Sequence, residues 1–284
     1  MSRGTGEGHR PTPGRVGPDG RRLPGEVSRM LPQALVLVAV CLLPLLSVQG
    51  CGPASDSADA AAPSGWGSAD SWVRPATGLP DPADFVSGVD NPYWPLPPGA
   101  RWVYEGETAD GLERIEVVVL DETRTVAGIE CVVVRDTVSL DGELIEDTYD
   151  WYAQDKDGNV WYMGEDSKEY EGGQASSTAG SWEAGVDGAL PGVKVWATPR
   201  VGDAPYYQEY YQGEAEDLGR DVALDGTASV AFGDYADLLV VEEWTPLEPE
   251  VVERKYYAAG VGTVKEEMTR GGSEVVELIQ FVRP

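Results

Sequence analysis

The sequence predicts an all-β protein: an antiparallel meander whose strands form a curved sheet, half-barrel or barrel, with little helix. From about residue 100 onward, segments with period-two alternation or β-branched residues follow one another, separated by turn residues. The chain shows no convincing amphipathic pattern with the helical period over ten residues. Because strands joined by short turns pair antiparallel with their neighbours, a meander is the expected topology.

The folded part is expected to begin near Asn91, within a single β domain over residues 89–284. Prolines at 92, 95, 97 and 98 exclude a helix and favour an extended entry, after which Trp102 starts the first strand. The roughly 190 residues that follow suffice for one hydrophobic core. Further strands are expected at Leu112–Leu120, Ile129–Val138, Glu146–Ala153, Asn159–Gly164, Val193–Trp196, Tyr206–Gln212, Thr227–Phe232, Leu238–Trp244, Val251–Ala258, Gly262–Met268 and Glu274–Val282.

An uncharged apolar run over residues 31–48 follows three arginines and ends just before Cys51. A basic segment, an apolar segment and small residues at the cut are typical of a secretory signal, here residues 1–50. Gly50-Cys51 resembles the lipobox of bacterial lipoproteins, in which the cysteine is diacylated, with palmitate as the expected fatty acid, and becomes the mature N-terminus. An uncleaved membrane anchor is the alternative, although two prolines within the run weaken a spanning helix.

The lipobox resemblance implies attachment by the N-terminal lipid to the extracytoplasmic face of the cell membrane. Residues 1–26 are rich in Gly, Pro and Arg, and they make an unusually long basic segment. A start at Val27 or Met30 would leave a signal of ordinary length, so the extra residues fit a misassigned start codon.

Small, acidic and proline residues dominate the segment behind the lipidated cysteine, residues 51–88. Such a composition buries too little apolar area to offset the entropy of ordering, which predicts a flexible tether. A flexible chain of this length spans about 35 Å on average. Trp66 and Trp72 within it either lie at the membrane interface or dock on the folded domain.

Several catalytic classes lack their residues. The single histidine, His9, lies in the expected signal, and Cys131 is the one cysteine beyond Cys51. Cys131 sits in a β-like run, which predicts a buried and inert thiol. Triads with histidine, zinc sites and phosphate-binding loops are therefore excluded, and no cofactor is expected.

Charge excludes nucleic acid as a partner. The whole chain has 21 Lys and Arg against 49 Asp and Glu. Residues 1–50 hold six of the basic and three of the acidic ones, so the mature part has 15 against 46, a formal charge of −31. Such a surface repels phosphates and anionic headgroups, and solubility is its simplest explanation.

Calcium is a weaker expectation at one turn. Asp155, Asp157 and Asn159 supply oxygen ligands at the first, third and fifth positions of a calcium loop. The glycine that such a loop needs is replaced by Val160, and position twelve is Asp166 rather than Glu. The segment is predicted to be a plain hairpin turn.

Amphipathic rings are the better indication of a binding surface, since the chain has 9 Trp and 13 Tyr against 3 Phe. Strand alternation in YYQEYY puts Tyr206 and Tyr210 on one face, and Tyr207 and Tyr211 on the other. One face is expected in the core, and the other is a candidate ligand surface. The full candidate set is Tyr206, Tyr207, Tyr210, Tyr211, Trp151 and Trp161.

Three segments carry a resemblance to a family. They are N-P-Y-x-P-L-P-P-G-x-x-W-V-Y-E-G from Asn91, W-Y-A-Q-D-x-x-G-N-V-W-Y from Trp151, and Y-Y-A-x-G-V-G-x-V-K from Tyr256. Over residues 91–268 the chain resembles a group of uncharacterised bacterial envelope lipoproteins, and this implies no activity. The expected architecture is similar to the half-barrel of outer-membrane lipoprotein carriers.

Three functions stay open. One is a non-enzymatic module that binds a small molecule, a lipid or a partner protein. Another is a purely structural surface protein. The third is a hydrolase that uses acidic residues, with Glu242, Glu243, Asp136 and Glu209 as eligible as any. A cavity inside the sheet would favour binding, and two carboxylates facing each other across a cleft would favour hydrolysis.

Overall fold

The computed structural model describes residues 62–73 and 78–284, so the predicted signal and the lipidation of Cys51 lie outside the described residues. Within the described ranges no helix is long and apolar enough to span a bilayer. Short 3-10 turns at Ala69–Ser71 and Pro82–Asp84 are the helical elements of this part of the chain. The prediction of an all-β protein is confirmed.

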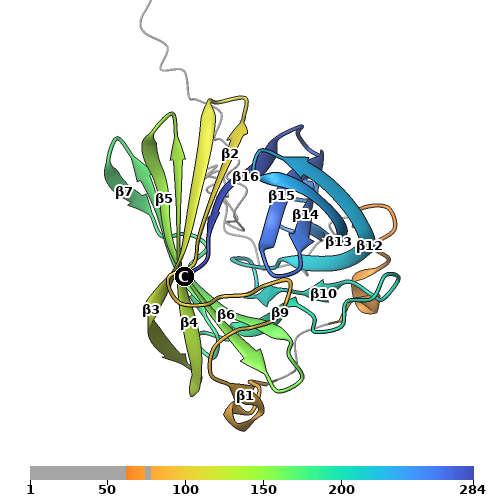
Figure 1. Cartoon of the computed structure of the whole chain (residues 1–284). Helices are drawn as coiled ribbons and strands as arrows, with labels where there is room; N and C mark the ends of the chain where they lie inside the picture. The colour runs from red at the N-terminus through yellow and green to blue at the C-terminus, as the bar shows by residue number, and fades with distance from the viewer. Residues whose placement is uncertain (1–61, 74–77) are drawn as a thin grey trace, which may run out of the picture. The chain divides into compact units, whose positions relative to one another are not determined.

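One antiparallel sheet contains the named strands (Figure 1), in the order β10-β12-β13-β14-β15-β16-β2-β3-β4-β5-β6-β9-β11. β1, β7 and β8 pair with β5 or β6 beside this path. The strands are β1 (Phe85–Val86), β2 (Arg101–Glu107), β3 (Leu112–Val126), β4 (Ile129–Leu140), β5 (Glu143–Asp155), β6 (Val160–Glu171), β7 (Gln174–Ser177), β8 (Trp182–Glu183), β9 (Leu190–Val195), β10 (Tyr206–Tyr207), β11 (Glu209–Tyr210), β12 (Leu218–Val230), β13 (Gly233–Trp244), β14 (Val252–Ala258), β15 (Gly262–Arg270) and β16 (Val275–Val282).

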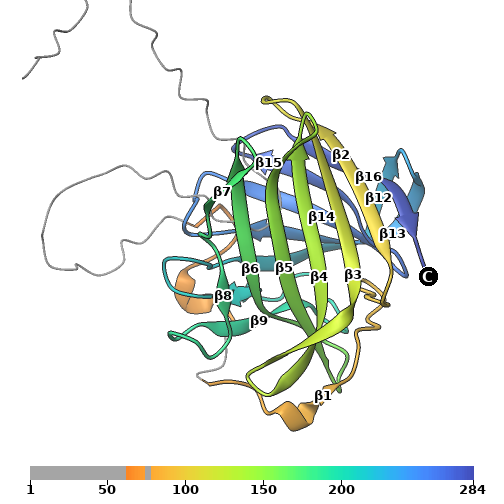
Figure 2. The ribbon, with the colours of Figure 1, turned by 90° about the vertical axis from the view of Figure 1, so that its left-hand side faces the viewer.

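Tight hairpins build the long half of the sheet from β2 to β6 (Figure 2). At the β3–β4 turn Ala127 and Gly128 both have positive φ, 51° and 83°, and Asp141 and Gly142 repeat the pattern at the β4–β5 turn with 50° and 85°. Two successive positive φ angles are characteristic of the type I′ turn, whose twist matches that of the flanking strands.

The sheet curls into a nearly closed barrel because its two edge strands are neighbours in the chain. β10 and β11 lie at opposite ends of the strand order and are separated only by Gln208. A Cβ at Gly192 of β9 would overlap the backbone of Tyr207 and Gln208, so only glycine permits this approach. The expected single strand over Tyr206–Gln212 is accordingly two short strands that pair with different partners, β12 and β9.

Two parts of the predicted tether, residues 62–73 and Phe85–Val86, contact the sheet and are therefore not a free linker. Trp66 and Trp72 are 1% and 7% exposed and form a cluster with Tyr207, Trp244 and other buried residues. Trp66 and Trp72 thus dock on the folded domain, which is one of the two positions that the sequence leaves open. Val73 continues the segment as a parallel bridge to Tyr206, and β1 pairs with β5.

Candidate functional site

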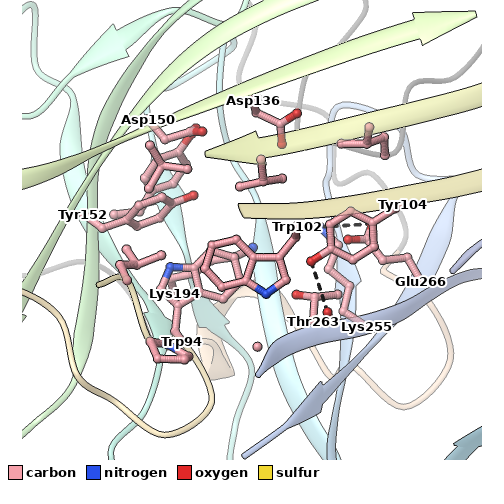
Figure 3. Close-up of a pocket in the computed structure, with 17 residues that line it drawn as sticks. Trp94, Trp102, Tyr104, Asp136, Asp150, Tyr152, Lys194, Lys255, Thr263 and Glu266 are labelled. Atoms are coloured by element: carbon pink, nitrogen blue, oxygen red, sulfur yellow. Dashed lines mark hydrogen bonds and ion pairs between the residues drawn. The ribbon is translucent and has the colours of Figure 1, made fainter. Parts of the chain in front are cut away.

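A cavity lies inside the curved sheet, between the β2–β6 half and the β14–β15 hairpin (Figure 3). The volume within which the centre of a water molecule can move is about 90 Å³. By the same measure a single bound water needs roughly 10–15 Å³, so the cavity has room for several. Its walls come from the loop before β2 and from strands β2, β3, β4, β5, β6, β9, β14 and β15. The lining residues are Trp94, Pro95, Leu96, Trp102, Tyr104, Ile115, Val117, Val134, Asp136, Asp150, Tyr152, Tyr162, Lys194, Lys255, Gly262, Thr263 and Glu266.

The proline-rich entry segment carries Trp94 to the cavity. The backbone N–H groups of Asp90 and Asn91 donate to Oε1 of Gln154 on β5, each at 2.9 Å. Asn91 in turn accepts from the N–H of Tyr93 and donates to the carbonyl of Gly158. These bonds fix the loop, since the prolines that flank it provide no backbone donors of their own.

Aromatic rings form much of the wall. Tyr152 stacks on Tyr162 with centroids 4.8 Å apart, and Trp94 meets the Tyr152 ring edge-on at 5.4 Å. Indole Nε1 of Trp102 donates to the carbonyl of Val261, and the hydroxyl of Tyr104 donates to the carbonyl of Thr263. Both bonds join β2 to the β14–β15 hairpin across the cavity, so these two rings are held in place.

A buried charge network closes the far side of the cavity. Lys194 of β9 and Lys255 of β14 approach Oε1 and Oε2 of Glu243 on β13 at 3.4 and 3.0 Å. Gln208 donates to Glu243 as well, and Lys255 lies 3.9 Å from Glu266. Burial opposes ionisation of Glu243, but the two lysines and the hydrogen bonds outweigh it and lower its pKa to about 2. Glu243 is therefore ionised between the two lysines.

Two further carboxylates line the cavity from neighbouring strands. Asp136 lies two residues beyond Val134, which pairs directly with Asp150, so the two acids are diagonal neighbours on one face. Burial raises the pKa of Asp136 well above its usual value, and the charge of Asp150 adds to the effect. Burial also raises the pKa of Asp150, to about 6, although the hydrogen bond from Tyr162 and both lysines favour its charged form.

Three buried polar atoms of these walls lack a hydrogen-bond partner among the described residues. They are Oδ1 of Asp136, Nε1 of Trp94 and Oε2 of Glu266, and only the last lies near a cation, 3.9 Å from Lys255. Buried polar atoms are almost always paired, and each exception needs an explanation such as a bound molecule. The cavity walls thus hold two unpaired carboxylate oxygens and one unpaired donor.

The aromatic residues predicted from the sequence lie elsewhere. Tyr206 and Tyr207 are both buried, at 4% and 5% exposure, while Tyr210 and Tyr211 are half-buried. The two faces of this segment therefore do not divide into core and ligand surface, because the chain here crosses the closure of the sheet. Tyr206 packs edge-on against Trp196 and lines a separate groove of about 310 Å³.

The two predicted tryptophans also point away from the cavity. Trp151 is buried beneath the guanidinium of Arg124, 3.8 Å from the ring centroid. Trp161 is half-buried, packs against Phe85 and donates to Asp155. Neither residue lines the cavity, although their strand neighbours Tyr152 and Tyr162 do.

The candidate calcium loop is the predicted hairpin turn. Oδ1 of Asp155 accepts from the backbone of Asp157 and Asn159, and Oδ2 accepts from the side chains of Asn159 and Trp161. These four bonds use the carboxylate to shape the turn. The described residues contain no group of three or more acidic, histidine or cysteine side chains placed to hold a metal ion.

The other acidic candidates are separated by strand geometry. Glu242 accepts from Trp66 and Arg220, whereas its neighbour Glu243 faces the lysines, so the pair cannot act together. Glu209 accepts from indole Nε1 of Trp182 at 2.8 Å and does not line the cavity.

Cys131 is buried as predicted. Its side chain is 0% exposed, and burial raises the pKa of the thiol to about 12. A thiol of that kind is unreactive at neutral pH.

Sequence reasoning missed Trp94, Lys194 and Lys255. A signal exists for Lys194, because it stands as the one charged residue in the apolar stretch GVKVW, whereas Lys255 follows Glu253 and Arg254 and is not marked in this way. A lysine at such a position requires a buried counter-ion, and that ion is Glu243.

No family model matches this chain, and no curated protein matches it. Among solved structures, a protein inferred to be exported, with a YmcC-like fold, from Bacteroides fragilis NCTC 9343 is 16% identical with a TM-score of 0.43, covering 67% of this chain and 99% of its own. A protein inferred to be a lipoprotein, from Parabacteroides distasonis ATCC 8503, is 13% identical with a TM-score of 0.38, covering 67% and 98%. At this level of similarity neither structure assigns a family or a function.

Proposed function

We propose that the chain is a lipid-anchored extracytoplasmic protein that binds a small molecule in the cavity without turning it over. The observation that carries the proposal is the set of three unpaired buried polar atoms, on Asp136, Trp94 and Glu266, in an aromatic cavity. Concave, mostly apolar sites with a few placed polar groups are typical of small-ligand binding. The anchor is inferred from the apolar run that ends at Cys51.

Native mass spectrometry of the mature protein, purified from its own membrane, tests the binding role. The wild type should retain a small molecule, and Trp94→Ala should lose it because the variant removes the unpaired donor and part of the wall. Trp161→Ala is the matched control, since Trp161 lies outside the cavity, and it should retain the molecule. Empty wild-type protein, or equal retention by both variants, would contradict the proposal.

The anchor needs a separate experiment. Cys51→Ser should release the protein from the membrane fraction or leave it unprocessed, because serine cannot be acylated through sulfur. Normal cleavage together with membrane retention of this variant would rule out the lipid anchor.

Acid–base hydrolysis is a second candidate, favoured by one observation. Diagonal neighbours on paired strands lie roughly 7–8 Å apart, within the separation of the two acids in inverting glycosidases. Asp136, with its raised pKa, would be the acid and Asp150 the base. Glycan or ester hydrolysis by the purified protein, lost in both Asp136→Asn and Asp150→Asn, would favour this candidate over binding alone.

A further inference from the structure

The cavity has two chemically different walls. In Figure 3 Asp136 and Asp150 lie on one side, and Trp94 and Lys194 lie on the other, with the rings of Tyr152 and Trp102 between them. The first wall therefore provides hydrogen-bond acceptors, while the second provides the indole N–H of Trp94 and the ammonium group of Lys194. The ammonium lies 5.7 Å from the centroid of the Trp94 ring, so the two donors are close together.

The lysines do not neutralise the acceptor wall. Both approach Glu243 at 3.4 Å or less, and Lys255 also approaches Glu266. Among the described residues neither lysine forms an ion pair with Asp136 or Asp150, although both act on Asp150 from a distance. Oδ1 of Asp136 has no hydrogen-bond partner in the described part of the chain.

Aromatic rings add a second attraction for positive charge. The faces of tyrosine and tryptophan attract ammonium groups, and the attraction grows when the group is removed from water. Trp102, Tyr104, Tyr152 and Tyr162 line the cavity beside the two aspartates. Two carboxyl groups without an ion-pair partner, one of them with an unpaired oxygen, thus lie among aromatic rings and form a site suited to an organic cation rather than to an anion.

We propose, resting on the binding function above, that the ligand is a small organic ammonium compound that also carries hydroxyl acceptors. The ammonium group binds at Asp136 and Asp150, and a hydroxyl oxygen accepts from Nε1 of Trp94. This arrangement pairs Oδ1 of Asp136 and Nε1 of Trp94, two of the three unpaired wall atoms, at once. The volume open to the centre of a water molecule, about 90 Å³, accommodates several water-sized groups. The cavity therefore has room for a compact molecule such as an amino sugar.

Tryptophan fluorescence and calorimetric titrations with glucosamine, glucose and N-acetylglucosamine test the charge requirement directly. The three sugars share their ring hydroxyls, and only glucosamine carries an ammonium group. The wild type should bind glucosamine about tenfold or more tightly than either neutral sugar, a margin expected from one desolvated cation contact. Asp136→Asn should bring the three affinities together, whereas Asp157→Asn, at an exposed turn carboxylate outside the cavity, should leave the preference intact.

Equal binding of the three sugars by the wild type would overturn the ammonium assignment and leave the binding function standing. Failure of glucosamine and of 2-aminoethanol to bind at about 10 mM, while native mass spectrometry finds another retained molecule, would overturn it in the same way. A preference for glucosamine that persists in Asp136→Asn, with correct folding checked by circular dichroism, would show that the cation binds elsewhere. Absence of any retained or titrated ligand would overturn both proposals.

Discussion

Two aromatic clusters of this protein are alike in composition and differ in how their polar atoms are paired. In the cluster around Trp66, indole Nε1 of Trp66 donates to Glu242, and Nε1 of Trp72 donates to the carbonyl of Trp66. In the cavity, Nε1 of Trp94 and Oδ1 of Asp136 have no partner among the described residues. A cluster with paired donors stabilises the fold, whereas one with unpaired atoms is poised to bind.

Adjacent residues of β13 separate the two regions. Glu242 faces the Trp66 cluster and pairs with Arg220 and Arg254, while Glu243 faces the cavity lysines. Strand alternation directs neighbouring side chains to opposite faces. Each carboxylate can therefore be changed without touching the other region.

The largest effect is expected at Glu243. Glu243→Gln leaves Lys194 and Lys255 buried without their shared counter-ion, which should cost about 3–5 kcal/mol of unfolding free energy. Urea denaturation measures the loss. Glu242→Gln is the matched control and should cost about 1 kcal/mol, since its ion pairs are closer to solvent. Equal costs for the two variants would remove the distinction between the regions.

The next effect concerns the docked segment. Trp66→Ala removes a side chain that is 1% exposed, together with its bond to Glu242, and should cost about 2–3 kcal/mol, less than a central core tryptophan because the segment can detach. Limited proteolysis should then cut within residues 62–73, which the wild type protects. Ligand affinity in the cavity should stay the same, and a parallel loss of binding would contradict the separation of the clusters.

Acidity should affect the cavity side of the sheet more than the Trp66 side. Burial raises the pKa of Glu113 to about 7, and burial raises that of Glu146 to about 8 against an opposing hydrogen bond from Thr148. Both groups hold protons in the folded state that the unfolded chain releases near pH 4.5. The contribution of these two groups to the free energy of unfolding is complete below that pH. It is lost as the pH rises through 7 for Glu113 and through 8 for Glu146, by about 2 kcal/mol or more for each group.

Denaturation midpoints measured between pH 5 and pH 9 check this direction. Glu113→Gln should flatten the decline, because glutamine has no proton to lose. The low pKa of Glu243, about 2, works the other way, and its contribution is lost as the pH falls from about 4.5 towards 2. Stability that rises steadily from pH 5 to pH 9 would contradict the account.

Much of the fold follows from local sequence, and the site does not. Alternating residues and turn pairs such as Asp141-Gly142 predict strands and hairpins, because both depend on neighbours in the chain. Which face turns inward is harder to predict, since β5 is buried on both faces over its last half. Trp151, a ligand candidate from the sequence, accordingly lies outside the cavity, while its neighbour Tyr152 lines it. The closure at Gln208 joins β9 to β13 and depends on contacts far apart in sequence, which no local pattern encodes.

The smallest effect on stability is expected at Asp136, where the preference for the ammonium compound should be lost. Burial raises the pKa of Asp136, so the charged carboxylate is costly in the ligand-free protein, and asparagine has nearly the same shape without the charge. Asp136→Asn should therefore leave the free energy of unfolding at pH 7 unchanged or raise it by about 1 kcal/mol. Urea denaturation of the ligand-free variant provides the measurement. A loss of several kcal/mol would mean that Asp136 supports the fold like Trp66, and the cavity would then be another structural cluster rather than a binding site.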